Sequence, residues 1–125
     1  MKKIARIERV ALYLQLALLI FCIQVNVASA ETSLEDLGCS AEPQLSSKQG
    51  SVSTSVTFIN NSSRTIRTYW LNYNGRRVYY AEVEPGKSYV QQTYYTHPWV
   101  ITNDPSGNCV SLFLPSKEPG VAVVR

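Results

Sequence analysis

Apolar and polar residues alternate along much of the chain from residue 52 onward, and a period of two is typical of half-buried β-strands. Val56 and Phe58 alternate with Ser55 and Thr57 in the first such stretch. Further stretches with strand character cover residues 65–71, 77–83, 88–93, 99–102 and 109–114. The pattern therefore predicts a domain built mainly from β-strands.

Turn signals separate these stretches. The Asn74-Gly75 pair is typical of a two-residue type I′ hairpin, in which both positions need a positive φ. The Glu-Pro-Gly-Lys sequence at residues 84–87 is typical of a type II turn. Short strands and frequent turns, without a long amphipathic helix, predict an all-β fold, a small antiparallel β-sandwich of about seven strands.

The first 30 residues have the three parts of a secretory signal peptide: a basic start that includes Lys2 and Lys3, an apolar stretch over residues 11–25, and Ala28-Ser29-Ala30. A signal anchor is the alternative, but a spanning helix needs about 20 apolar residues. We expect a signal peptide over residues 1–30, a loosely packed N-terminal arm over 31–50 and the β-sandwich over 51–125. The compact leader indicates a secreted or periplasmic protein and favours a bacterial source.

Cleavage of the leader changes the charge balance. The whole chain has a formal net charge of +3, but four of its 12 Lys and Arg residues and one of its nine Asp and Glu residues lie in the first 30. The remaining domain has eight of each and is nominally neutral. This balance gives no support for nucleic acid as a partner. We also expect no membrane association after cleavage.

Cys39 and Cys109 are the two cysteines that remain after cleavage, because Cys22 lies in the leader. An even pair in an oxidising compartment favours a disulfide, and two unpaired buried thiols are the alternative. The bridge would close a loop of about 70 residues and contribute roughly 4 kcal/mol in the chain-entropy description. That is a large share of the stability of a small domain.

Aromatic residues gather between residues 70 and 99, a stretch that holds both tryptophans, the single histidine and six of the eight tyrosines. Aromatic side chains pack cores, but Tyr and Trp also present polar tips at binding surfaces. The Thr-Tyr-Tyr-Thr-His-Pro-Trp run at residues 93–99 is the strongest candidate for a ligand site. Its threonine, tyrosine and histidine tips would all need hydrogen-bond partners inside a core.

No sequence pattern indicates catalysis or a cofactor. One histidine and two cysteines predicted to be bridged cannot assemble a usual zinc site. A nucleophile elbow, a Gly-rich phosphate loop and an H-E-x-x-H motif are all absent from the sequence. Glu82 and Glu84 would share one strand face, but beside a Pro-Gly turn we interpret them as exposed surface. We therefore expect no enzyme activity, no metal and no cofactor.

Residues 58–116 resemble the β-domain of the von Hippel-Lindau tumour suppressor family. The outer shared elements are Phe58-x-Asn60-x-Ser62 and Phe113-x-Pro115-Ser116. Between them, and in register without a gap, lie Trp70-Leu71-Asn72-Tyr73-Asn74-Gly75, Tyr80, Pro85-Gly86, Tyr94 and His97-x-Trp99. The resemblance implies a small β-sandwich that recognises an extended peptide containing 4-hydroxyproline.

The resemblance also implies which residues line the ligand site. The aromatic walls that it implies are Trp70, Tyr80, Trp99 and Tyr94. His97 corresponds to one hydrogen-bond partner of the ligand hydroxyl, and Thr93 stands where the family has the second, a serine. This chemistry is consistent, because an aromatic cage suits an apolar prolyl ring and a buried hydroxyl needs both a donor and an acceptor.

The chain departs from the family after the β-domain. The family's second, helical domain binds elongin C and links the protein to a ubiquitin ligase, whereas ten residues follow Pro115 here. We therefore expect no elongin and no ubiquitin ligase as partners. The partner that the resemblance implies is a protein or peptide containing proline or hydroxyproline.

Turn geometry and the resemblance disagree about Tyr80. A two-residue loop at Asn74-Gly75 pairs Trp70 with Tyr79, which turns Tyr80 to the opposite face of the sheet. The resemblance requires Trp70 and Tyr80 on the same face. A longer loop or a β-bulge near Arg76 would place them together.

Three functions fit these observations. The first is a secreted or periplasmic module that binds an extended peptide containing proline or hydroxyproline. The second is a carbohydrate-binding module, since aromatic faces also stack on sugar rings, and the third is a structural or inhibitory accessory protein without a small ligand. A concave cage containing Thr93 and His97 would favour the peptide, and a flat exposed aromatic row would favour the sugar.

Overall fold

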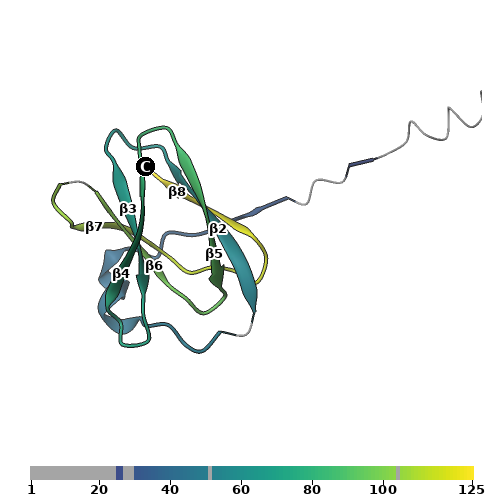
Figure 1. Ribbon diagram of the computed structural model, residues 1–125, viewed down its shortest axis with the longest axis horizontal. Coiled ribbons are helices and arrows are strands. Elements are labelled where there is room, and N and C mark those ends of the chain that lie inside the picture. The colour runs from purple at the N-terminus through teal and green to yellow at the C-terminus, as the bar shows by residue number, and fades with distance from the viewer. Residues whose placement is uncertain (1–24, 27–29, 51, 104) are drawn as a thin grey trace, which may run out of the picture.

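Eight β-strands and one short 3-10 helix form the described part of the chain, which covers residues 25–26, 30–50, 52–103 and 105–125 of a computed structural model (Figure 1). The elements are β1 (Thr32–Ser33), η1 (Cys39–Gln44), β2 (Ser53–Asn60), β3 (Ile66–Leu71), β4 (Arg77–Val83), β5 (Ser88–Tyr94), β6 (Trp99–Asn103), β7 (Cys109–Phe113) and β8 (Gly120–Val124). The predicted signal peptide lies almost entirely outside the described residues. Among the residues described, no helix has the length and apolar character needed to cross a bilayer.

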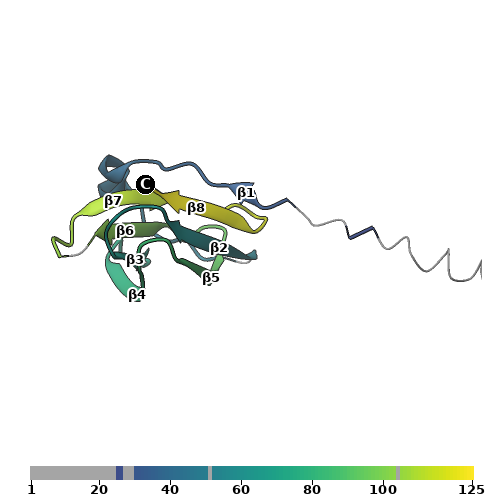
Figure 2. The same ribbon diagram turned by 90° about the horizontal axis from the view of Figure 1, so that it is seen from above.

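Two four-stranded sheets pack as the layers of a sandwich (Figure 2). One has the strand order β1-β8-β2-β5 and the other β4-β3-β6-β7. The predicted all-β sandwich is thus confirmed, but β8 runs parallel to both β1 and β2, so the fold is mostly rather than wholly antiparallel. The sequence pattern does not predict β8, because its apolar run lacks the polar alternation that marks a half-buried strand.

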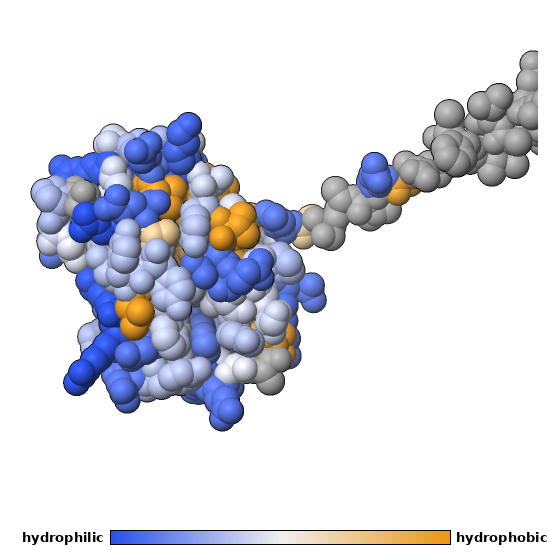
Figure 3. Space-filling model, in the orientation of Figure 1, coloured by the Kyte–Doolittle hydropathy of each residue, from blue (hydrophilic) through white to orange (hydrophobic). Residues whose placement is uncertain are grey.

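Alternate side chains of both sheets fill the space between the layers. The buried cluster consists of Val56, Phe58, Ala122 and Val124 from one sheet and Ile66, Val83, Trp99, Ile101 and Phe113 from the other. Every second residue of β2 is buried from Thr54 to Asn60, which confirms the predicted alternation. Most apolar side chains thus face the interior. On the face of the molecule drawn in Figure 3, apolar residues form separate small patches among hydrophilic side chains.

The sheet β4-β3-β6-β7 is also covered on its outer face. A second buried cluster there consists of Leu71, Val100 and Leu112, packed against Leu45, Tyr69 and Cys109. Leu45 directly follows η1, so the N-terminal arm supplies the cover. The expectation of a loosely packed arm is therefore wrong for residues 39–47, because an apolar sheet face needs them as its lid.

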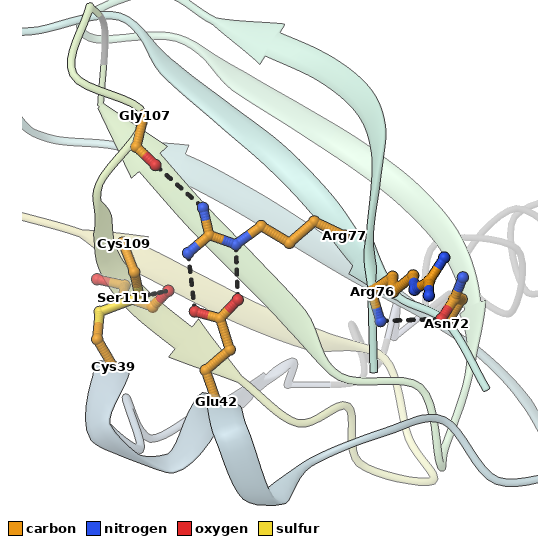
Figure 4. A network of polar contacts seen from close by, with 8 residues as sticks. All are labelled: Cys39, Glu42, Asn72, Arg76, Arg77, Gly107, Cys109 and Ser111. Atoms are coloured by element: carbon orange, nitrogen blue, oxygen red, sulfur yellow. Dashed lines mark hydrogen bonds and ion pairs between the residues drawn. A yellow bond between two sulfur atoms is a disulfide. The ribbon is translucent and has the colours of Figure 1, made fainter. Parts of the chain in front are cut away.

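The predicted disulfide is present and joins Cys39, at the start of η1, to Cys109, at the start of β7, with Cα atoms 5.8 Å apart. At the opposite edge of the same sheet, Arg77 of β4 donates to the two carboxylate oxygens of Glu42 at 2.6 and 2.8 Å (Figure 4). Arg77 also donates to the Gly107 carbonyl at 3.0 Å. The helix η1 is therefore fastened to both edge strands of the sheet that it covers.

The β3–β4 loop differs from the predicted two-residue turn. The amide of Gly75 donates to the Asn72 carbonyl, and the amide of Asn72 donates to the Arg76 carbonyl, each at 2.9 Å. Gly75 has a φ of 71°, whereas no residue other than glycine has a positive φ in the described part of the chain. The type I′ prediction is therefore wrong, since it needs a positive φ at Asn74 as well. The loop contains three residues and ends on a glycine, a common hairpin form.

This longer loop resolves the disagreement over Tyr80. It pairs Trp70 with Val78 instead of Tyr79. The register then shifts between Thr68 and Tyr69, and Tyr80 is left without a direct partner on β3, as in a β-bulge. Of the two predicted alternatives the longer loop is present, whereas the bulge lies at Tyr80 and not near Arg76.

Asn60 joins three segments at one end of the sandwich. Its buried side-chain amide donates to the carbonyls of Val83 and Arg64 at 2.8 and 2.7 Å. Its side-chain oxygen accepts hydrogen bonds from the amide and the hydroxyl of Ser62. The chain that follows β2 is thus anchored to the end of β4 by a fully buried amide.

Replacing Asn60 by alanine is expected to lower the free energy of unfolding by about 2–3 kcal/mol, because it strands the buried Val83 carbonyl and removes the turn contacts. Asn61→Ala is the matched control, since Asn61 is exposed and adjacent in sequence. It should change stability by about 0.5 kcal/mol or less. Urea unfolding of both variants measures this, and equal losses would contradict the role assigned to Asn60.

Candidate functional site

The six predicted site residues come from four strands and one loop. Trp70 lies near the end of β3, Tyr80 in the bulge of β4, Thr93 and Tyr94 at the end of β5, His97 in the loop that follows, and Trp99 at the start of β6. Trp70 and Trp99 are direct partners across β3 and β6, which puts their side chains on the same face of the sheet. The site is therefore built around this pair of strands.

One half of the candidate site is a group of four rings, which consists of His97 and three aromatic rings around it. The imidazole centroid lies 5.2 Å from the Trp70 ring, with an angle of 31° between the planes, and 5.2 Å from the Tyr94 ring. Tyr73 stands edge-on to both His97 and Trp70, at 5.7 and 5.5 Å. Tyr73 was not among the predicted site residues, although it lies in the same aromatic stretch of the sequence.

The other half is centred on Trp99. Tyr80 packs edge-on against the Trp99 ring at 5.0 Å, which places it on the side predicted by the resemblance. The indole N–H of Trp99 donates to the Thr93 hydroxyl at 3.0 Å. Trp99 itself is only 2% exposed and packs against Phe58. Trp99 is thus a core residue that contacts the candidate site from the interior of the sandwich, while Tyr80 is exposed.

Thr93 and His97 are the two predicted hydrogen-bond partners of a ligand hydroxyl, and both are buried. The Nε2 atom of His97 is buried and has no hydrogen-bond partner among the residues that the structure describes. Burial lowers the pKa of His97 below its usual value, and a hydrogen bond with the Lys48 backbone partly opposes that change. The imidazole is therefore neutral near pH 7, and Nε2 lacks a polar contact that a buried nitrogen normally has.

The N-terminal arm contributes residues that the sequence did not predict. The Ser47 hydroxyl is buried, accepts a hydrogen bond from the Trp70 indole N–H at 2.6 Å and donates to the Leu71 carbonyl at 2.5 Å. The Thr96 hydroxyl donates to the Lys48 carbonyl at 2.7 Å. Ser47 stands in a polar stretch without alternation, so no sequence signal distinguishes it from a surface serine.

The two halves are joined by the Trp70–Trp99 pairing and by the chain connection from Thr93 to Tyr94. Their rings meet at angles from 31° to 90°, so they do not form a flat row. Apolar ring faces next to two buried polar groups suit a small apolar ring that carries a hydroxyl. No cluster of three or more His, Cys, Asp or Glu residues able to hold a metal occurs among the described residues.

The fold and the aromatic cluster define a small β-sandwich domain with a candidate recognition site at the start of β6. Residues 45–120 match the family model of the VHL beta domain, and the chain belongs to this family. The match begins at Leu45, so it includes the arm residues that contact Trp70. No curated protein matches the chain.

The free energy of unfolding is expected to fall as the pH is lowered from about 7 to about 5. The unfolded chain protonates His97 near the ordinary histidine pKa, whereas burial delays protonation in the folded chain. The unfolded state then binds more protons in this window and is favoured. In His97→Gln the decrease should be smaller, because His97 is the single histidine. Urea unfolding at both pH values compares the two proteins, and identical decreases would contradict the assignment.

Proposed function

We propose that the chain is an exported binding module whose aromatic cluster holds an extended peptide segment containing proline or 4-hydroxyproline. The observation that carries this proposal is the buried, unpartnered Nε2 of His97 between the Trp70 and Tyr94 rings. An unmet hydrogen bond at such a position costs free energy in the empty protein. A ligand that supplies the missing partner recovers that cost.

The polar groups have complementary roles toward a ligand hydroxyl. The Thr93 hydroxyl already accepts a hydrogen bond from Trp99, so its own proton is left to donate. A neutral imidazole has one nitrogen that accepts, and burial favours this neutral form in His97. A hydroxyl that accepts from Thr93 and donates to His97 would satisfy both groups. A pyrrolidine ring would meanwhile contact the aromatic faces.

The edges of the sandwich support an extended ligand. Within the described part of the chain, strands β4 and β5 each pair with one neighbouring strand, so each has an unpaired side. These edge strands carry Tyr80, Thr93 and Tyr94. Extended peptides commonly add to such edges through their main chain, while alternate side chains enter pockets. The proposed ring pocket and a free strand edge therefore belong to the same region.

The carbohydrate alternative receives less support. Sugar rings stack on broad aromatic faces, but the planes of Tyr80 and Trp99 are inclined by 77° and those of Tyr73 and Trp70 by 87°. An accessory protein without a small ligand would leave the buried Nε2 of His97 unexplained. The peptide hypothesis accounts for both the ring angles and the polar groups.

Export is part of the proposal and rests on the signal-peptide pattern together with the Cys39–Cys109 disulfide. The protein recovered from the exported fraction is expected to begin at Glu31. Its intact mass should be two hydrogens lower than that of the same chain with free thiols. Mass spectrometry before and after reduction measures both. A chain that retains the leader, or thiols that alkylate without reduction, would contradict it.

His97→Ala and Thr93→Ala are expected to weaken binding of a hydroxyproline peptide while changing the affinity for the matched proline peptide little. Each variant leaves the ligand hydroxyl with one partner missing, which costs about 1–3 kcal/mol. Isothermal titration with the two peptides measures the difference. Tyr80→Ala should instead weaken both peptides alike, because it removes an exposed apolar wall and no hydroxyl contact.

Gln92→Ala is the control for the same titration. Gln92 precedes Thr93 on β5 and is exposed. Its affinity for both peptides should equal that of the parent protein. Equal affinity of the parent protein for the two peptides, unaltered by His97→Ala, would show that the hydroxyl is not recognised.

A further inference from the structure

Residues 45–48, here called the strap, contact both Trp70 and the loop that carries His97. The strap carries Ser47, which accepts the Trp70 indole N–H and donates to the Leu71 carbonyl. The Ser47 amide also donates to the Asn72 carbonyl at 3.1 Å. Trp70 is therefore held in place from the strap side as well as from β3.

The strap also reaches the loop that carries His97. The Lys48 carbonyl accepts a hydrogen bond from the Thr96 hydroxyl, and the Lys48 amide donates to the Thr96 carbonyl at 3.4 Å. The Lys48 backbone further contacts His97 itself. Directly beyond the strap, Gly50 passes so close to Tyr94 that an added Cβ atom would lie 2.6 Å from the Tyr94 Cβ.

One covalent link fixes the chain that leads into the strap. Cys39 of η1 is bonded to Cys109, while the bidentate Glu42–Arg77 ion pair on the other edge is partly exposed and is the weaker, non-covalent one of the two fastenings. Before η1, Leu34 and Leu37 donate backbone hydrogen bonds to β8 and β7. These bonds do not involve the disulfide. Opening the disulfide would therefore free residues 38–48 and leave the preceding residues attached.

The core between the sheets does not depend on this segment. Its buried cluster contains no residue of the strap or of η1, whereas the outer cluster includes both Leu45 and Cys109. Local release of the strap is thus separable from unfolding of the sandwich. Release of the strap would therefore remove its hydrogen bonds to Trp70 and to the loop that carries His97.

We propose that the Cys39–Cys109 disulfide controls the candidate site: closed, it holds the strap against Trp70 and His97, and reduction releases the strap and dismantles that half of the site. Reduction by a dithiol such as dithiothreitol transfers two electrons. The S–S bond breaks, each cysteine sulfur becomes a thiol, and the reagent is oxidised to its cyclic disulfide. The effect on a ligand rests on the proposed function, whereas the effect on Trp70 does not.

The two tryptophans provide an internal comparison for the test. The chain has two tryptophans, and the indole N–H of Trp70 donates to Ser47 in the strap while that of Trp99 donates to Thr93 in the sheet. A proton–nitrogen correlation spectrum records one indole signal from each. On reduction, and equally in a Cys39→Ser, Cys109→Ser double variant, the Trp70 signal is expected to shift and exchange faster with solvent. The Trp99 signal should stay in place.

Other results in this spectrum would overturn the proposal. If neither indole signal changes, the strap stays in place without the disulfide. If both signals are lost, the disulfide holds the whole fold and not the site. Ser47→Ala in the oxidised protein should reproduce the Trp70 change. Val124→Ala, which lies in the core between the sheets, is a destabilised control that should leave the Trp70 signal unchanged.

The ligand arm uses the hydroxyproline peptide with oxidised and reduced protein. We expect reduction to weaken binding about tenfold, since the Trp70 wall and the His97 surroundings lose their hydrogen-bonded support. Unchanged affinity with a shifted Trp70 signal would overturn the proposed control of binding. Absence of binding by the oxidised protein would refute the proposed function instead, and the indole signals would still decide whether the disulfide holds the cluster.

Discussion

The pairing of Trp70 with Trp99 across β3 and β6 is the contact on which the candidate site depends. Directly opposed residues of antiparallel strands share one face, so the two side chains leave the sheet on the same side. Each indole N–H needs an acceptor once buried, and each finds a hydroxyl, Ser47 for Trp70 and Thr93 for Trp99. The pair thereby fixes the arm on one side and β5 on the other.

The sequence predicts the features of the fold that short-range patterns determine. Alternation around Val56 and Phe58 identifies β2, and the Pro-Gly turn appears as expected, with a φ of 75° at Gly86. The type I′ prediction for Asn74-Gly75 was wrong because the type of the turn follows from the register of the whole hairpin. The Trp70–Trp99 pairing and the core fix that register. Such long-range constraints leave no local sequence signal.

Coverage of both faces of one sheet explains the other deviations. Ser111, Leu112 and Phe113 are buried in succession, although alternation predicts one exposed residue among them. The inner face packs against the other sheet and the outer face lies under the arm, so period two is lost. A sequence reading that treats the arm as a separate, loosely packed segment therefore misses both its cover of the sheet and the role of Ser47 at Trp70.

The residue types of the run 93–99 already marked it as a candidate site, but Trp70 and Tyr80 joined that site only through the family resemblance. Trp70, Tyr80 and His97 are scattered over two strands and a loop, and no spacing rule unites them. The bulge that brings Tyr80 to Trp99 is a feature of the folded hairpin. Tyr73 was missed because it lies within the segment that resembles the family but has no role carried over from the family.

In a domain of this size the core and the site share residues, and this sharing limits how the site can vary. Trp99 and Thr93 are buried and hydrogen-bonded to each other, so changes there alter stability as well as binding. Tyr80 and Tyr94 are exposed and contribute ring faces at smaller structural cost. His97 combines both roles, because it is buried in the fold and is also a candidate partner of the ligand. Its unpartnered nitrogen is unfavourable in the empty protein, so a ligand that satisfies it binds selectively over one that cannot.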